Sequence, residues 1–190
     1  GSPLSNSTFQ FINKTLNQKS FIYSISGGTD IVSCFMLGIP TKPVYAGEIQ
    51  GPGLGMDIDV FDEKGKSSKQ TGELVCKTPF PSKPIYFWND KNFSKYRSAY
   101  FEKFSNIWSH GDYVKKTNNG GYIIYGRSDA TLNPGGVRIG TGEIYSALQH
   151  FSWIEDSLAT GYLIDNDEKI ILFIKVTRIK LPANHIDLIK

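Results

Sequence analysis

Cysteine is scarce in this chain of 190 residues, which contains only Cys34 and Cys76, far apart in the sequence. Two cysteines are too few for a disulfide framework, and neither belongs to a CxxC motif or a Cys/His pattern with metal-ligand spacing. The three histidines, His110, His150 and His185, are equally scattered. We therefore expect two structural thiols buried among apolar residues, no Cys/His metal site, and a reducing compartment such as the cytoplasm.

Long apolar runs and an excess of one charge are missing as well. The longest apolar runs, such as Ile170 to Ile174, fall far short of the roughly 20 residues of a membrane-spanning helix. No signal-peptide pattern opens the chain. The 21 basic and 18 acidic residues leave a net charge of +3, which is too balanced to predict nucleic acid or an anionic membrane as the main partner. The hydrophobic content of 39% is enough for one sizeable core or two small ones.

The most informative stretch runs from Tyr125 to Gly140 and reads YGRSDATLNPGGVRIG. Arg127 and Arg138 flank a turn that carries one carboxylate, Asp129, and a series of closely spaced helix and strand breakers. Glycines beside both arginines let a ligand approach the backbone, and guanidinium groups match the oxygens of a phosphate. These residues alone are equally compatible with a surface hairpin that carries two solvated arginines.

A second segment, residues 23–30, reads YSISGGTD and predicts a short strand that runs into a Gly27–Gly28 turn. Glycines let a flat base or a phosphate lie close to the backbone. Thr29 can donate a hydrogen bond to a phosphate oxygen, and Asp30 can hold Mg²⁺, which prefers oxygen ligands. Taken alone, a simple turn is the commoner explanation of this pattern.

A third segment, residues 108–113, reads WSHGDY. Asp112 follows a glycine, and a carboxylate in that position can accept hydrogen bonds from both hydroxyls of a ribose. An aspartate that only forms a turn is also common in such a context.

In this order and spacing, the three segments resemble the adenylate-forming superfamily, which includes acyl-CoA synthetases, luciferases and the adenylation domains of peptide synthetases. Within this superfamily, the sequences of the motifs are most similar to those of the acetoacetyl-CoA synthetases. The resemblance extends from Gly1 to about Val176. It is carried by SISGGTDI at 24–31, GELVC at 72–76, YFWND at 86–90, KYR at 95–97, YFEKF at 100–104 and the arginine-containing stretch at 125–140.

The resemblance implies an ATP-dependent acid–thiol ligase that uses ATP, Mg²⁺ and coenzyme A. In such enzymes a carboxylate, here acetoacetate, attacks the α-phosphate of ATP and releases pyrophosphate. Coenzyme A then displaces AMP from the acyl-adenylate to give a thioester. Relatives have a large nucleotide-binding domain and a small mobile lid. Residues 1–128 would be the β-rich end of the large domain, and residues 129–190 would be the start of the lid.

The resemblance also implies roles for residues in the second and third segments. Gly27 and Gly28 would line the adenine side of the nucleotide. Thr29 would contact the α-phosphate, Asp30 would hold Mg²⁺, and Asp112 would bind the ribose hydroxyls. The family usually has Glu where this chain has Asp30, so the contact with the metal is expected to be indirect, through water.

The remaining implied roles lie in the stretch around the two arginines. Arg127 would steady the nucleotide, Asp129 would be the hinge between the domains, and Arg138 would belong to the moving face of the lid. Gly136 would let the pantetheine arm of coenzyme A pass close to the backbone.

Two family motifs are missing, namely the glycine-rich phosphate loop with its lysine and the catalytic lysine of the lid. Lys190 has no Ser-Gly-Lys context for the latter role. We therefore expect a segment of a ligase that is inactive alone.

The predicted fold class is α+β, with a β-barrel-like portion of an adenylate-forming large domain followed by the start of a small α+β lid. We expect a helix near residues 9–16 that is capped by Ser5 or Ser7, and a further helix that is capped by Thr141. The other expected elements are a half-buried strand over 56–60, a strand over 74–77, strand ends at 123–125 and 137–139, a hairpin of 158–164 with 169–176, and a helix over 183–190.

Nine aromatic residues gather between Tyr86 and Trp108. Core packing is the favoured interpretation, and a stacking platform for a sugar or base is the other. Two alternative functions therefore stay open: an enzyme that adenylates another carboxylic acid, and a non-catalytic β-rich module that binds carbohydrate. The sequence does not decide the acyl substrate or the oligomeric state.

Overall fold

The computed structural model describes residues 4–16, 20–164 and 167–177. The chain divides into two compact units, Gly1–Asp129 and Ala130–Lys190. Among the described residues, no helix is both long enough and apolar enough to cross a membrane.

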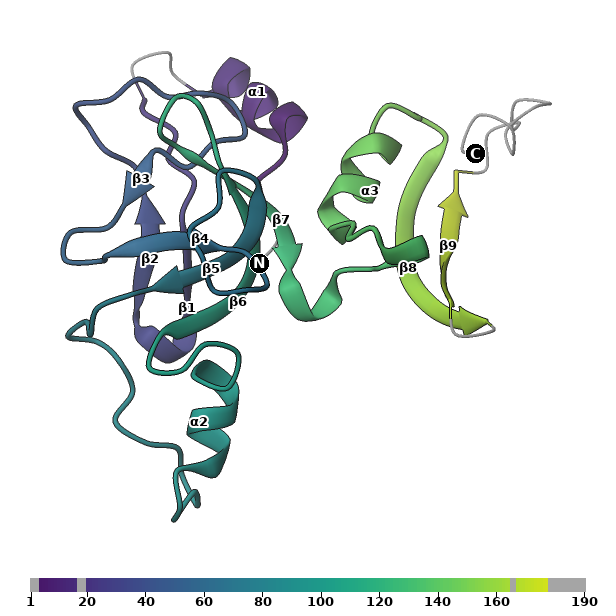
Figure 1. Cartoon of the computed structure of the whole chain (residues 1–190). Coiled ribbons are helices and arrows are strands. Elements are labelled where there is room, and N and C mark those ends of the chain that lie inside the picture. Colours follow the sequence, from purple (N-terminus) through teal and green to yellow (C-terminus); the bar gives the residue numbers. More distant parts are fainter. Residues whose placement is uncertain (1–3, 17–19, 165–166, 178–190) are drawn as a thin grey trace. The chain divides into compact units, whose positions relative to one another are not determined.

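The first unit contains two helices and two antiparallel sheets (Figure 1). Strands β1, β2 and β3 form one sheet in that order, and β4, β5, β6 and β7 form the other. A single bridge between Ile49 and Tyr122 connects the segment before β3 to β7. The elements of this unit are α1 (Asn6–Thr15), β1 (Ser26–Gly28), β2 (Ser33–Leu37), β3 (Gly51–Pro52), β4 (Ile58–Phe61), β5 (Thr71–Cys76), α2 (Ser94–Tyr100), β6 (Trp108–Lys116) and β7 (Tyr122–Arg127).

The second unit contains one helix and a two-stranded antiparallel sheet. Its elements are the short 3-10 helix η3 (Pro134–Gly136), α3 (Thr141–Leu148), β8 (Ile154–Ile164) and β9 (Asp167–Val176). The hairpin of β8 and β9 confirms the expected pair of strands and extends both of them. The helix expected over 183–190 lies outside the described residues.

The α+β prediction is confirmed, and the part expected to resemble a barrel consists of two open sheets within the described residues. Local patterns explain several elements. The Ser5 hydroxyl accepts a hydrogen bond from the Thr8 N–H at 3.2 Å, which satisfies a donor that the first turn of α1 leaves free. In β4, Ile58 and Val60 are buried while Asp59 between them is half-buried, as the alternating pattern predicts.

Two expectations at turns are wrong. Residues 137–139 form no strand, because only Ile139 bridges to Leu132 and the preceding Pro-Gly-Gly makes a 3-10 turn. The residue that caps α3 is Gly140 rather than Thr141, and its N–H donates to the Glu143 carboxylate at 3.2 Å. Both errors lie at the boundaries of elements, where assignments commonly shift by one or two residues.

The core of the first unit confirms that most of the aromatic cluster is packing. Tyr96, Tyr100 and Trp108 are buried and form one apolar cluster with Phe35 and Val60. Cys76 is also buried in it, whereas Cys34 is only half-buried, so the expectation of two buried thiols holds for one.

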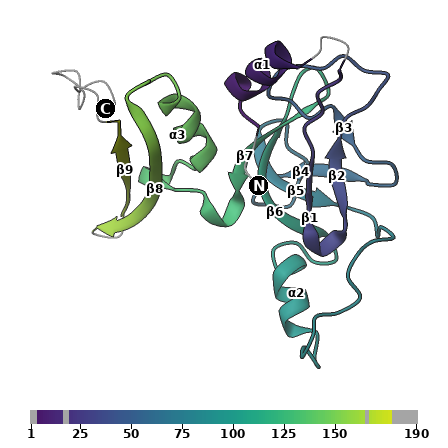
Figure 2. The same cartoon turned by 180° about the vertical axis from the view of Figure 1, so that it is seen from behind.

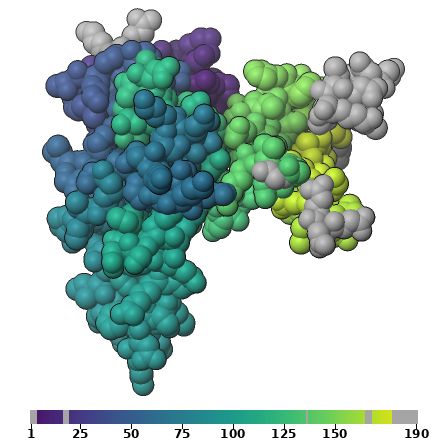
Figure 3. Space-filling model, in the orientation of Figure 1, coloured from purple at the N-terminus to yellow at the C-terminus, as the bar shows by residue number. Residues whose placement is uncertain are grey.

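Helix α2 lies at the end of the first unit opposite α1 (Figures 1 and 2) and forms part of a narrow projection (Figure 3). Its first turn is held by Asp90, whose carboxylate accepts hydrogen bonds from the N–H groups of Lys95 at 3.1 Å and Tyr96 at 2.8 Å. A single side chain therefore anchors the helix that supplies Tyr96 and Tyr100 to the core.

The Asp90 anchor predicts a pH dependence of stability. Burial raises the pKa of Asp90, but hydrogen bonds from Tyr96, Lys95 and Ser94 outweigh burial and hold it below the ordinary value of 3.8. Protonation therefore favours the unfolded state, and the stabilisation is complete above the ordinary pKa and lost as the pH falls through the lower folded one. Asp90→Asn should lower the free energy of unfolding at about pH 6 and make less difference at about pH 3.

The measurement is urea unfolding of both proteins at each pH. Glu102→Gln is the matched control. It removes a carboxylate just beyond the end of the same helix, and that carboxylate accepts a hydrogen bond from the Ser98 hydroxyl. A difference between Asp90→Asn and the wild type that stays constant with pH would contradict the role of the charged carboxylate.

Candidate functional site

Asp112 and Arg127 face each other across strands β6 and β7 of the four-stranded sheet. The Arg127 guanidinium donates to the His110 carbonyl oxygen at 2.9 Å and lies 3.5 Å from the Asp112 carboxylate. Its Nε lies 3.3 Å from Asp129 Oδ1. The Arg127 side chain nevertheless remains 51% exposed, so it is anchored on one side and accessible on the other.

Asp112 also connects the two sheets of the first unit. Its Oδ2 accepts a hydrogen bond from the Ser26 hydroxyl of β1 at 3.1 Å, and its side chain is 13% exposed. An ionised carboxylate has about four acceptor positions. Ser26 and Arg127 use only part of this capacity, so Asp112 can accept further hydrogen bonds from a ligand hydroxyl.

Gly27 and Gly28 belong to β1 and do not form the predicted turn, which follows at Thr29–Ile31. A Cβ on Gly27 would lie 2.2 Å from the carbonyl oxygen of Ser33 in the neighbouring strand. A Cβ on Gly28 would lie 2.1 Å from Asp30 Oδ1. Glycine is therefore required at position 27 by a backbone contact, whereas at position 28 an added Cβ would first meet the end of the Asp30 side chain.

Thr29 and Asp30 occupy the short 3-10 helix η1 (Thr29–Ile31), and both are exposed. Asp30 Oδ2 accepts a hydrogen bond from the Tyr100 hydroxyl at 2.5 Å. Burial, then this hydrogen bond and the nearby charge of Asp30, raise the pKa of Tyr100 well above its ordinary value, so the hydroxyl stays protonated and donates. The described residues contain no group of three or more side chains arranged to hold a metal ion.

The motif analysis assigned no role to three residues that shape this site. Glu73, 3% exposed, accepts a hydrogen bond from the Gly111 N–H at 2.8 Å and pairs with Lys103. His110 is buried against Phe35 and approaches Asp112 at 3.9 Å. Tyr100 donates its hydroxyl to Asp30. The signal was present in the segments GELVC, WSHGDY and YFEKF, but a motif does not show which residues meet across strands.

Gly136 and Arg138 belong to the second unit. Gly136 ends η3, and Arg138 is exposed two residues later. In the same unit, the Asn133 N–H donates to the Glu168 carboxylate of β9. Asp129, the expected hinge, lies in η2 (Ser128–Ala130) and is the last residue of the first unit. The structure therefore brings together predicted residues of the first unit, whereas Gly136 and Arg138 belong to the second unit.

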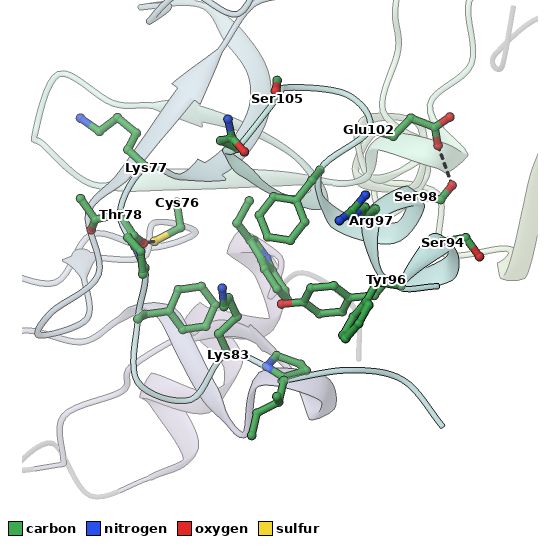
Figure 4. Close-up of a pocket in the computed structure, with 18 residues that line it drawn as sticks. Cys76, Lys77, Thr78, Lys83, Ser94, Tyr96, Arg97, Ser98, Glu102 and Ser105 are labelled. Carbon is green, nitrogen blue, oxygen red and sulfur yellow. Dashed lines mark hydrogen bonds between the residues drawn. The ribbon is translucent and has the colours of Figure 1, made fainter. Parts of the chain in front are cut away.

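A groove of about 1030 Å³ lies elsewhere in the first unit, between the segment after β5 and α2. Figure 4 shows Lys83 on one side of it and Tyr96 and Arg97 of α2 on the other. None of the predicted nucleotide-binding residues lines this groove. The cluster around Asp112 and Arg127 is therefore not part of this groove.

Gly111 provides a test of how the Arg127 guanidinium is held. Its φ is +83°, and an added Cβ would lie 2.3 Å from Arg127 Nη2. Gly120 has a φ of +77° with nothing within 4 Å of an added Cβ, so Gly120→Ala is a matched control. Both variants should lose about 1–2 kcal/mol of stability from left-handed strain. Only Gly111→Ala should also shift the NMR resonance of the Arg127 Nε–H group, and an unshifted resonance would contradict the contact.

The chain is similar to acetoacetyl-CoA synthetases over nearly its whole length. It is 51% identical to the enzyme of Rhizobium meliloti over 179 residues, 94% of this chain and 28% of that protein. It is 47% identical to the enzyme of Gallus gallus over 188 residues, 97% of this chain and 27% of that protein. No family model matches the chain.

Solved structures of CoA ligases are also similar to this chain. Acetoacetyl-CoA synthetase from Streptomyces lividans matches with a TM-score of 0.85 and 39% identity, covering 100% of this chain and 29% of that one. The anthranilate CoA ligase AuaEII, in complex with anthranoyl-AMP, matches with a TM-score of 0.78 at 21% identity, which shows a shared fold alone. The chain is thus similar to acetoacetyl-CoA synthetases over almost all of its own length, and it spans little more than a quarter of the length of the relatives it matches.

Proposed function

We propose that the chain carries part of the nucleotide site of an ATP-dependent acid–thiol ligase that converts acetoacetate, ATP and coenzyme A to acetoacetyl-CoA, AMP and pyrophosphate. The observation that carries the proposal is the Asp112–Arg127 pair, fixed across two strands and joined by Ser26 to the glycine strand that leads to Thr29 and Asp30. The identity to acetoacetyl-CoA synthetases supports it.

In this proposal each residue contacts one part of the nucleotide. Asp112 accepts hydrogen bonds from the ribose hydroxyls, for which it has unused acceptor positions. Arg127 presents its exposed guanidinium to the nucleotide. Thr29 donates its hydroxyl to the α-phosphate, and the backbone of Gly27 and Gly28 lines the adenine side.

Asp30 is the residue that would hold Mg²⁺. It is exposed, the Tyr100 hydroxyl donates to one of its oxygens, and no residue that the structure describes donates to the other. Mg²⁺ is commonly bound by one or two carboxylates together with substrate phosphates and water, so a single carboxylate fits this use. When bound, the ion would neutralise phosphate charge. Aspartate is one methylene shorter than the family's usual glutamate, which favours contact through a water molecule.

The second unit would contribute to the thioester-forming step. We propose that it is the start of the mobile lid, with Asp129 as the hinge, Arg138 on its moving face and Gly136 beside the pantetheine arm of coenzyme A. The two half-reactions need little covalent chemistry from the protein. Positioning of the reactants and stabilisation of charge at the α-phosphate carry most of the rate enhancement.

The alternatives differ in their support. Adenylation of a different carboxylic acid uses the same nucleotide residues and stays the second candidate, because no residue of this chain is assigned to the acyl group. The carbohydrate-binding module is not supported, since Tyr96, Tyr100 and Trp108 of the aromatic cluster pack into the core.

The proposed nucleotide role of Asp112 is tested by Asp112→Ala in the complete ligase. Loss of the carboxylate should weaken ATP binding, measured by calorimetry, by about 2–5 kcal/mol, the scale for a buried charge-assisted hydrogen bond. Asp62→Ala is the control, because Asp62 holds a turn by accepting from the N–H groups of Lys64 and Lys66. Equal ATP affinity in the Asp112 variant and the wild type would show that Asp112 is only structural.

The hinge is tested by Asp129→Pro in the complete ligase. Proline fixes φ near about −65° and removes the N–H group, whereas a hinge must change φ and ψ between two states. If the variant is held in the adenylating state, ATP–pyrophosphate exchange should survive while thioester formation collapses. Arg138→Ala is the comparison, since it changes contacts without locking the backbone. Equal losses in both half-reactions with an unchanged melting temperature would count against Asp129.

A further inference from the structure

The Tyr100 hydroxyl and the Asp30 carboxylate meet at 2.5 Å although they are 70 residues apart in the sequence. We propose that Tyr100 is a positioning residue that fixes the orientation of the Asp30 carboxylate for the magnesium–nucleotide complex. This inference rests on the proposed function, and the resemblance assigns Tyr100 no role. Its evidence is the way in which Tyr100 is held and the space that is left around Asp30.

The Tyr100 ring is packed among three aromatic rings of the core. It is 9% exposed and stacks on the Trp108 indole with a centroid distance of 3.7 Å and an interplanar angle of 14°. Phe87 and Tyr96 each meet it edge-on at 5.6 Å. A ring packed in this way keeps its rotamer, so the hydroxyl has a fixed position.

Asp30 lacks such support of its own. It lies on a one-turn 3-10 helix and is exposed, so its carboxylate would otherwise sample several rotamers. The Tyr100 bond holds Oδ2. Oδ1 lies next to Gly28, where an added Cβ would come within 2.1 Å of it. The glycine therefore leaves room for Oδ1, and the tyrosine holds the other oxygen, Oδ2.

The arrangement also relates Asp30 to the other end of the proposed nucleotide site. Trp108, on which Tyr100 stacks, begins β6, and Asp112 lies four residues further along the same strand. Strand β6 thus carries Asp112, the carboxylate proposed to bind the ribose. Through Trp108 and Tyr100 it also supports Asp30, the carboxylate proposed to bind the metal. Partners that orient a ligating carboxylate commonly affect metal affinity by about 10–100-fold when removed.

The test compares Tyr100→Phe with Tyr96→Phe in the complete ligase. Both changes remove one buried hydroxyl from the same helix, but the Tyr96 hydroxyl has no hydrogen-bond partner among the described residues. ATP affinity is measured by calorimetry with Mg²⁺ and with EDTA, and thermal unfolding is recorded without ligand. Tyr100→Phe should weaken binding of ATP with Mg²⁺ by about 10-fold or more and binding without Mg²⁺ by much less, while Tyr96→Phe should change neither.

The outcomes separate the inference from the proposed function. An equal loss with and without Mg²⁺, or no loss in Tyr100→Phe when Asp30→Asn abolishes the benefit of Mg²⁺, would overturn the positioning role and leave the function intact. If Asp30→Asn and Asp112→Ala both leave ATP binding unchanged, the proposed nucleotide site itself is wrong. A double-mutant cycle of Tyr100→Phe and Asp30→Asn on unfolding, without ligand, should show coupling; additive effects would overturn the inference.

Discussion

The Asp112 carboxylate is the contact on which the site depends, because it links the two sheets of the first unit. Ser26 of the three-stranded sheet donates to one of its oxygens, and Arg127 of the four-stranded sheet faces the other. A partly buried carboxylate that lost these donors would be costly, so the two sheets are constrained to bring the glycine strand and the arginine together. The geometry of the proposed nucleotide site is therefore coupled to the packing of the unit.

Buried groups behind this contact keep it rigid. Glu73 is nearly inaccessible and holds the N–H of Gly111, the residue next to Asp112. A buried carboxylate needs a compensating charge, and Lys103 supplies it. On the other side, the aromatic core fixes Tyr100 and through it Asp30. Two ends of a polar surface site are thus set by side chains that never reach the surface, a common arrangement where precise placement matters.

Residues close in sequence were predicted well, and residues that meet across strands were not. The alternation from Met56 to Val60, the Ser5 cap and the hairpin of β8 with β9 follow from local periodicity and capping, which need only neighbouring residues. The glycine pair was expected in a turn, but its place in β1 depends on the pairing with β2, a contact that no local pattern encodes. For the same reason Tyr100 and Glu73 were missed, since their roles exist only once α2 and β5 are packed.

Asp30 has a side chain one methylene shorter than a glutamate, and the Tyr100 hydroxyl holds its carboxylate. A shorter side chain reaches less far toward a bound nucleotide, so its direction matters more. The Tyr100 hydroxyl stays protonated because burial and the hydrogen bond to Asp30 raise its pKa, so it acts as a donor throughout the physiological range. The aromatic core therefore also holds one hydroxyl in place beside the carboxylate that is proposed to bind the metal.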